Sequence, residues 1–245
     1  MLGNGFFFTE SHNPDFPDEE WSLVYENTTA GAYSENFGWG KYKVVMSGGG
    51  GSGAAVIRHS QENGMEFVYC RDGYAGEEQT VFLNVLSDEN KTFSGIIGAG
   101  GKGSVVKLQI GFSVDASSTY GGIGAGYDNG NTANTKYAYD SGQTTPINAG
   151  AWVGGSGGGS TSIEVDGVLN TTAAGGNGGS VRINYNGYKT STGGAGGSGG
   201  TTTGTGSAGG ANVSSKVSST TTKTSGDGID GYVRIYKSNL KPEPI

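Results

Sequence analysis

The sequence has few of the residues on which metal and catalytic sites are usually built. Its 245 residues include one cysteine, Cys70, and two histidines, His12 and His59. One cysteine cannot form an internal disulfide, and these three side chains are too few for a tetrahedral zinc site. We therefore expect no metal and no cofactor, and a fold that is stable without covalent cross-links.

Charged residues are also scarce. They make up 15% of the chain, and the formal net charge is −7. No run of Lys or Arg occurs, so the basic surface that nucleic-acid binding needs is missing. No stretch approaches the ~18 consecutive apolar residues of a membrane span, and the apolar run at residues 6–8 is too short for a signal peptide. The sequence predicts neither a nucleic-acid partner nor membrane insertion.

Glycine, in contrast, is abundant. It supplies 50 residues, about three times its usual share. Each glycine in a helix costs about 1 kcal/mol relative to alanine, so dense glycine tracts cannot be helical. Between the tracts lie runs rich in Val, Ile, Phe and Tyr that alternate in polarity, as half-buried strands do. The sequence therefore predicts an all-β protein, a jelly-roll-like β-sandwich.

The glycine tracts are too many for hairpin turns alone. In residues 193–200, glycine occupies most positions and Ala or Ser the remainder, which suits polyglycine II, an extended helix of three residues per turn. Several such helices side by side would bond through their backbone amides and carbonyls. The alternative is that these tracts, above all residues 193–226, are flexible linkers.

Composition divides the chain into three parts. Residues 1–40 are acidic and aromatic and lack a glycine tract, so we expect an arm that docks on another protein, or a first β layer. Residues 41–237 are the glycine-rich β domain, and residues 238–245 are a C-terminal tail. The side chains expected to dock are Phe6, Phe7, Phe8, Phe16 and Trp21.

One pattern imitates an enzyme. Gly48, Gly50 and Gly53 follow a strand-like run with the spacing of a dinucleotide-binding fingerprint, and Asp72 stands where an acid would take the ribose hydroxyls. The same spacing recurs at residues 98–103, where the next run is a strand, and no alternating helices follow. A dinucleotide-binding enzyme is therefore a minor alternative to a protein without catalytic activity.

Other chemical motifs are incomplete. Lys102 lies in a loop that is similar to a phosphate-binding loop, but Ile96 replaces its first glycine and Gly103 its Ser or Thr. Cys70 is interpreted as a buried strand residue. Several aspartates could bind calcium, but they lack the spacing of a calcium loop. These are Asp115, Asp128, Asp140 and Asp166.

Three motifs follow one another in a characteristic order. KYKVVMSGGGGSGA opens the domain, TFSGIIGAGGKG lies inside it, and GDGIDGYVRIYK closes it. Over residues 41–237 the chain resembles the glycine-rich domain of bacteriophage tail-fibre and related virion surface proteins. The resemblance implies a β-sandwich with packed polyglycine II helices, no catalysis, and an adhesive role in a virion assembled in the bacterial cytoplasm. We also expect other virion proteins as partners, and a homo-oligomer in which burial against further copies of the chain helps to order the glycine tracts.

Residues 127–152 are the longest stretch between strands that carries bulky side chains. Aromatic faces stack on sugars or apolar patches, and amides and carboxylates bond hydroxyls, so this stretch is expected to bind a host-surface glycan or protein. The receptor-binding residues would be Tyr127, Tyr137, Tyr139 and Trp152. Alternatively, these aromatics cover the end of the sandwich or a subunit interface.

Two further functions stay open. The protein could be a purely structural decoration or adaptor of the virion that binds no receptor. It could also be an ice-binding or cell-surface protein, which would need a flat threonine face at residues 201–203 and 220–222.

Overall fold

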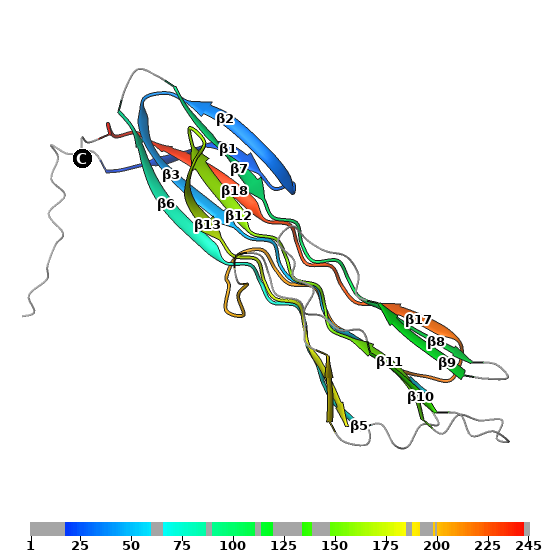
Figure 1. Ribbon diagram of the computed structural model, residues 1–245. Coiled ribbons are helices and arrows are strands. Elements are labelled where there is room, and N and C mark those ends of the chain that lie inside the picture. The colour runs from blue at the N-terminus through cyan, green and yellow to red at the C-terminus, as the bar shows by residue number, and fades with distance from the viewer. Residues whose placement is uncertain are drawn as a thin grey trace, which may run out of the picture.

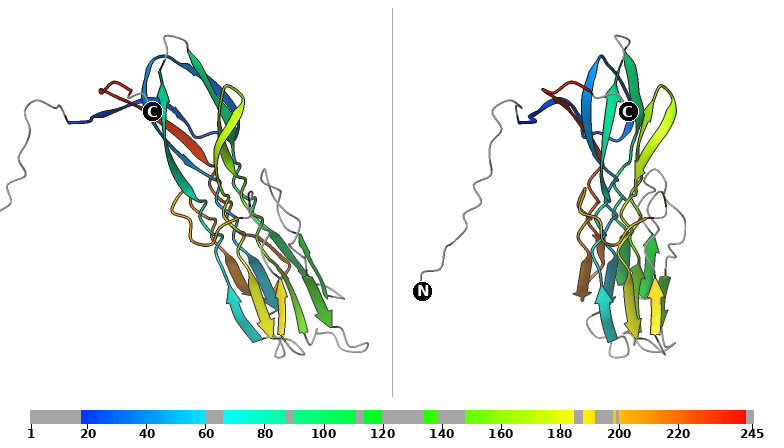
Figure 2. Two further views of the ribbon diagram at one scale, coloured as in Figure 1. Left: turned by 60° about the vertical axis from the view of Figure 1, so that its left-hand side comes forward. Right: turned by 90° about the vertical axis from the view of Figure 1, so that its left-hand side faces the viewer.

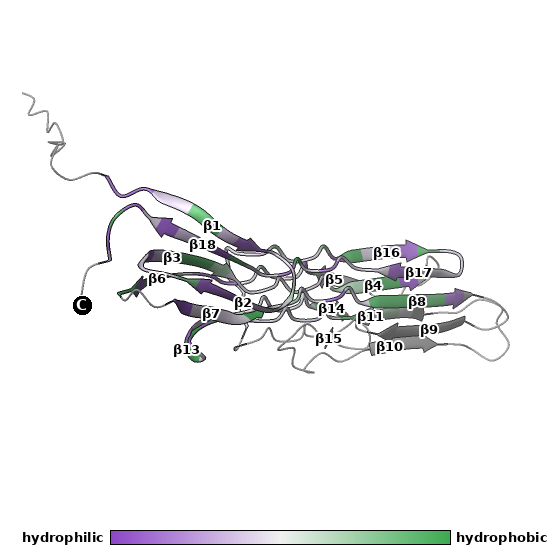
Figure 3. Ribbon diagram, turned by 90° about the horizontal axis from the view of Figure 1, so that it is seen from above, coloured by the Kyte–Doolittle hydropathy of each residue, from purple (hydrophilic) through white to green (hydrophobic). Residues whose placement is uncertain are grey.

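The molecule is elongated, with β-sheets at both ends and extended glycine-rich segments between them (Figure 1). The computed structural model describes residues 18–59, 66–86, 90–110, 114–119, 134–138, 148–184, 188–191, 198 and 200–242. Apolar residues are concentrated in the strands of the two ends, and the connecting segments are nearly neutral in hydropathy (Figure 3). The all-β prediction is confirmed.

One end is a sandwich of two four-stranded sheets, which we call the proximal sandwich. The strand order of the first sheet is β1 (Trp21–Asn27), β18 (Tyr232–Ser238), β3 (Gly40–Ser47) and β6 (Glu78–Val85). The second sheet runs β13 (Val168–Ala173), β12 (Thr161–Val165), β7 (Lys91–Ile97) and β2 (Gly31–Phe37). The sandwich prediction is thus confirmed, while a jelly-roll connectivity stays a prediction.

Side chains from both sheets fill the sandwich. In β3, Tyr42, Val44 and Met46 are buried while the residues that alternate with them up to Val45 are only half-buried, because successive side chains of a strand point to opposite faces. Phe93 of β7 meets Tyr42 edge-on, with ring centroids 5.5 Å apart. Burying this apolar surface stabilises the end of the molecule that carries both described chain termini.

Residues 21–37 belong to this sandwich as edge strands. β1 pairs antiparallel with β18, and β2 pairs with β7 over its full length. The two strands therefore lie at the edges of different sheets and do not form a layer of their own.

The other end stacks three sheets, which we call the distal sheets (Figure 2). The middle sheet runs β10 (Asn134–Ala138), β11 (Asn148–Val153), β4 (Ala55–His59), β16 (Val213–Val217). The two others run β15 (Tyr188–Ser191), β14 (Val181–Asn184), β5 (Glu66–Cys70) and β17 (Thr221–Thr224), β8 (Val105–Ile110), β9 (Val114–Thr119).

Strand β4 is covered on both faces. Ile57 packs with Leu108 of β8, and Val56 packs with Ile183 of β14. A strand buried on both faces needs apolar residues at consecutive positions. This explains the unbroken run from Ala54 to Ile57.

Most of the core residues that the sequence predicts are buried. Val81 and Leu83 are only half-buried, and the side chain of Phe67 lies outside the described residues. The remaining predicted core residues are at most 1% exposed: Val44, Ile57, Ile97, Leu108, Ile163, Val181, Ile183, Val233 and Ile235.

Seven extended segments join the two ends, and we call them together the glycine bundle. Six of them, each seven residues long, link a strand of the proximal sandwich to a strand of the distal sheets, and the seventh leads into β16. They are I (48–54), II (71–77), III (98–104), IV (154–160), V (174–180), VI (206–212) and VII (225–231).

Segment I lies at the centre of the bundle and is buried throughout. Its N–H groups donate in turn to segments II, IV and VII, so that each neighbour is bonded at every third residue. Its carbonyls accept from segments III, V and VI: Gly50 from Gly101, for example, at 2.8 Å. A period of three residues is that of polyglycine II.

The six outer segments close a ring around segment I. In the order II, VI, VII, III, IV, V, each bonds to the next through backbone N···O contacts of 2.7–3.0 Å, and V bonds back to II. Segments that leave the sandwich alternate around this ring with segments that return to it. The polyglycine II prediction is confirmed for segments I, III, IV, V and VI, which coincide with glycine tracts of the sequence. Segments II and VII have the same bonding but were not predicted, and most of residues 193–200 lies outside the described residues.

Candidate binding surfaces

The outer side of sheet β1-β18-β3-β6 carries a cluster that we call the aromatic-cationic face: Trp21, Lys41, Lys43, Phe82 and Tyr236. The ammonium of Lys43 lies 5.0 Å from the ring centroid of Trp21 and 4.8 Å from that of Tyr236. Trp21 and Phe82 have ring centroids 5.7 Å apart. Ammonium groups are attracted to aromatic faces, so the cluster is held together without ion pairs between its members.

Strand register builds this face. Leu23 is opposite Tyr236, Tyr236 is opposite Lys43, and Lys43 is opposite Phe82, which makes one row across all four strands. Leu23 is 50% exposed and Phe82 is 61% exposed. Single exposed apolar residues are ordinary; here two of them lie at the ends of one row, with Tyr236 and Lys43 between them.

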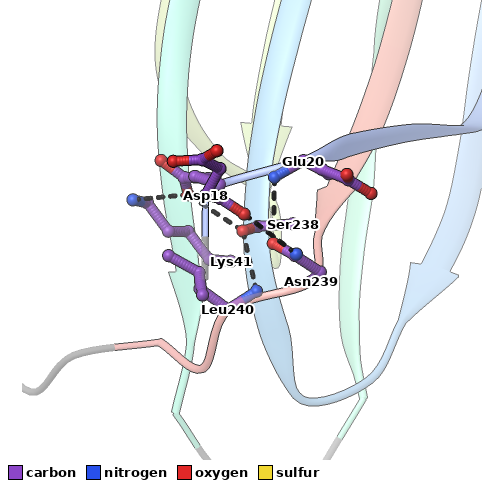
Figure 4. Close-up of polar contacts among 7 residues, drawn as sticks. Asp18, Glu20, Lys41, Ser238, Asn239 and Leu240 are labelled. Carbon is purple, nitrogen blue, oxygen red and sulfur yellow. Dashed lines mark hydrogen bonds and ion pairs between the residues drawn. The ribbon is translucent and has the colours of Figure 1, made fainter. Parts of the chain in front are cut away.

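The first and last described segments are tied together beside this face (Figure 4). The Glu20 N–H donates to Asn239 Oδ1 at 3.0 Å, and the Asn239 N–H donates to the Glu20 carbonyl at 3.1 Å. Asn239 Nδ2 also donates to the Asp18 carbonyl. Residues 18–20 and 238–240 therefore run side by side at one end of the molecule.

Glu19 connects these hydrogen-bonded terminal segments to β3. Its Oε1 accepts from Lys41 Nζ at 2.8 Å and from Ser238 Oγ at 2.9 Å. The hydrogen bond from Lys41 lowers the pKa of Glu19 below its ordinary value. A pocket of about 280 Å³ lies beside Lys41 and is lined by Lys41, Asn84, Leu240 and Lys241.

The structure brings one predicted docking residue into this surface. Trp21 lies in the aromatic-cationic face. The other four, Phe6, Phe7, Phe8 and Phe16, lie outside the described residues. Sequence reasoning missed Lys43, Phe82 and Tyr236, which lie far apart in the chain.

None of the four predicted receptor residues has a described, exposed side chain. Tyr127 and Tyr139 lie outside the described residues, and Tyr137 is paired with Ala149 in β10 without a described side chain. Trp152 is 3% exposed and packs against Val56 and Ile183. Its prediction as a receptor contact is therefore wrong: β11 lies in the middle of three layers, so a large side chain there belongs to the core.

The dinucleotide fingerprint does not form a site. Gly48, Gly50 and Gly53 lie in segment I, where a Cβ atom would approach backbone carbonyl oxygens of segments V and VI to 2.0–2.1 Å. Residues 55–59 then form β4 and not the helix whose N-terminus would hold a pyrophosphate. The glycines are required by backbone packing, and this alternative is wrong.

Two acids at the spacing of the glycine helices bond backbone amides. Asp227 and Asp230 of segment VII accept from the N–H groups of Gly103 and Gly100 of segment III, each at 2.7 Å. Burial alone would raise the pKa of Asp227, but the Gly103 N–H and the ion pair with Lys102 at 3.1 Å lower it overall. The spacing of three residues between these two aspartates is the sequence feature that could have predicted their bonding to a neighbouring glycine helix.

Asp166 has a structural role too. It has φ 51° in the two-residue turn with Gly167 that joins β12 to β13, the positive-φ conformation that tight hairpins need. Its carboxylate accepts from the Thr92 N–H at 2.9 Å and pairs with Lys91 at 2.7 Å. Within the described residues, no three His, Cys, Asp or Glu side chains gather as a metal site.

Cys70 lies in β5 and packs against the distal core. Burial, and then the charge of Asp72, raises the pKa of its thiol to about 12. At neutral pH the sulfur is therefore a thiol and a poor nucleophile.

The threonines that an ice-binding face would need lie apart. Thr201 bonds to segment V of the glycine bundle, whereas Thr221 and Thr222 lie in β17 of the distal sheets. They do not form one flat surface.

No protein-family model and no curated protein sequence matches this chain. Over the part of the chain that the structure describes, no helix has the length and hydropathy to cross a membrane.

Proposed function

We propose that this protein is a surface component of a bacteriophage virion, a fibre or fibre-tip protein without catalytic activity. In this proposal the proximal sandwich attaches to other virion proteins, and the distal end is presented to a host-surface glycan or protein. The observation that carries it is the glycine bundle, because a hydrogen-bonded bundle between two β ends is suited to holding them at a fixed distance.

The two ends differ in a way that supports this assignment. Residues 18–20 and 238–240 are tied together on the proximal sandwich, next to a row of side chains in which Leu23 and Phe82 are exposed and Tyr236 and Lys43 lie between them. Such a row, with polar groups around it, is typical of protein interfaces.

The opposite end is where the chain turns back most often. The connections β4–β5, β8–β9, β9–β10, β10–β11, β14–β15 and β16–β17 all join strands of the distal sheets. Recognition residues are commonly found on connections that a rigid scaffold positions. Tyr127 and Tyr139 belong by sequence to two of these connections and remain our candidates for receptor contact, with Tyr137 of β10.

Two measurements test the proposal. Antibodies against the recombinant protein should label the surface of purified virions, and their failure to bind would contradict it. Virions that carry the folded double variant Tyr137→Ala/Tyr139→Ala should adsorb to host cells at least tenfold more slowly. The matched control is Ile229→Ala, a change at a 60% exposed residue of the glycine bundle. Labelled virions with unchanged adsorption would instead support a structural decoration that binds no receptor.

A further inference from the structure

Edge strand β6 differs from the other edges of the proximal sandwich. Edge strands expose unpaired N–H and C=O groups, and proteins usually protect them with bulges, charges or short length. The pairing of β1 has a register shift between Leu23 and Tyr25, and that of β13 has one between Leu169 and Thr171. β2 exposes small and polar residues, among them Glu35.

β6 has none of these protections along its central residues. Its eight residues pair with β3 in unbroken register. Its one charge, Glu78, is at the first residue. Among the residues that the structure describes, no backbone group outside β3 bonds to residues 79–85.

Both sides of β6 also leave apolar surface uncovered. On the core side, Val81 and Leu83 are only half-buried. On the outer side Phe82 is 61% exposed, and Leu86 beyond the strand is 53% exposed. A strand added at this edge would cover both sides of the sheet at once.

We infer that β6 is a self-association edge at which a second copy of this chain pairs through its own β6. Two copies related by a two-fold axis pair antiparallel, and the axis fixes which residue faces itself. Centring the axis on Phe82 places Phe82 opposite its own copy and Val81 opposite Leu83 of the second copy. Both are pairs of apolar residues of the kind that stabilises sheets.

The alternative registers match less well. Centring on Val81 places Phe82 opposite Thr80, and centring on Leu83 places it opposite Asn84, so the aromatic loses its apolar partner. With the axis at Phe82, Glu78 faces Leu86 and no like charges are opposed. The two Trp21–Phe82 contacts then join into one aromatic row across the interface.

The edge strand of the second sheet next to β6 also exposes apolar residues, which favours an interface on this side of the sandwich. β13 lies next to β6 (Figure 1), and its Val168 and Leu169 are 70% and 60% exposed. In the antiparallel pair, the two distal ends point in opposite directions. The assembly would thus be a bivalent unit, which goes beyond the proposed function and does not depend on it.

Sedimentation equilibrium tests this inference on the full chain. The wild type is expected to reach twice its 24.8 kDa mass in the micromolar range. Phe82→Lys puts two ammonium groups opposite each other at the axis and should weaken the dimer at least tenfold. The matched control is Ile96→Lys, a change at a 51% exposed residue on the other sheet, which should leave the dimer intact. A wild type that stays monomeric, or a Phe82→Lys variant that dimerises unchanged, would overturn the inference.

Cysteine cross-linking tests the register. Directly opposite residues of antiparallel strands have Cα atoms about 4.5–5.5 Å apart, within disulfide range. Phe82→Cys should therefore form an intermolecular disulfide. In Thr80→Cys, the same strand and face, the two sulfurs would be about 13 Å apart along the strands and should not bond. The double variant Thr80→Cys/Asn84→Cys should cross-link even if Phe82→Cys is poorly folded. Equal cross-linking of Phe82→Cys and Thr80→Cys would contradict the register.

Discussion

Single glycines of segment I are the residues on which the bundle most depends. At Gly50, a Cβ atom would lie 2.0 Å from the carbonyl oxygen of Ala208, and that oxygen is backbone. The contact cannot be relieved by turning a side chain, so the segments would have to separate. Overpacking typically costs about 1–3 kcal/mol, and more where the backbone itself must move.

We predict that Gly50→Ala lowers the free energy of unfolding by at least about 3 kcal/mol. Urea denaturation of the variant and the wild type measures this difference. Ala208→Val is the matched control, since Ala208 is exposed and its side chain points away from the bundle; it should cost less than about 0.5 kcal/mol. Equal stability of the Gly50→Ala variant and the wild type would show that segment I is loosely packed.

Asp227 makes the bundle sensitive to acid. Its pKa is lowered in the folded protein by the Gly103 N–H and by Lys102, while in the unfolded chain it is about 3.9. The stabilisation from its charge is therefore present above the unfolded value and is lost as the pH falls through the lower folded value. Asp227→Asn keeps an oxygen that accepts from Gly103 but carries no charge.

We therefore expect Asp227→Asn to be less stable than the wild type at pH 7 by no more than about 0.5 kcal/mol, because water screens this half-exposed charge. The difference should shrink as the pH falls below about 3.9 and vanish only below the lower folded value, where the wild-type carboxylate is protonated as well. Denaturation midpoints measured between pH 2 and pH 7 test this, with Asp227→Ala as the comparison that also loses the acceptor. A deficit that is the same at every pH would mean that the charge plays no part.

At the scale of the elements, the strands could be predicted from the sequence better than the segments between them. The alternation in residues 41–46 identifies Tyr42, Val44 and Met46 as one face of β3, because a half-buried strand imposes a period of two. Segment II was not predicted as a glycine helix. It has glycine only at Gly73 and Gly76, where a Cβ atom would meet backbone atoms of segment I, and a side chain at each of its other five positions.

The stacking of the distal sheets and the aromatic-cationic face could not be predicted, because both depend on contacts between strands that are distant in the sequence. Nothing local distinguishes a strand of a two-layer sandwich from the middle strand of three layers, so Trp152 looked like the end of an exposed loop. The aromatic-cationic face depends on pairing between β1, β18, β3 and β6, which are separated by up to about two hundred residues of chain. Such a surface follows from strand order, which residue patterns do not specify.

The bonding of segment I predicts slow exchange of its amide hydrogens. Each N–H of residues 48–54 donates to a backbone carbonyl at 2.8–3.1 Å and is buried on all sides. Hydrogens of this kind exchange only through large openings of the structure. We expect these amides to exchange as slowly as those of β3, although they belong to no sheet. Exchange of residues 48–54 as fast as at the exposed turn residue Gly167, measured by hydrogen–deuterium exchange, would contradict the role of segment I as the core of the bundle.

At the scale of the whole molecule, the period of the glycine helices sets the distance between the two ends. Each residue of polyglycine II advances about 3.1 Å and turns the chain by one third of a revolution. Adding three residues to each segment restores every hydrogen-bond direction, with Gly-Gly-Gly in segment I and Gly-Gly-Ser in the six outer segments, where the Ser faces outward. It should lengthen the molecule by about 9 Å and leave both ends folded.

Adding two residues to each segment turns the donors away from their acceptors and should destabilise the bundle. Small-angle scattering reads the maximum dimension, and thermal unfolding reads the stability. The prediction fails if both sets of insertions are tolerated equally, because the segments would then be acting as linkers whose length is free.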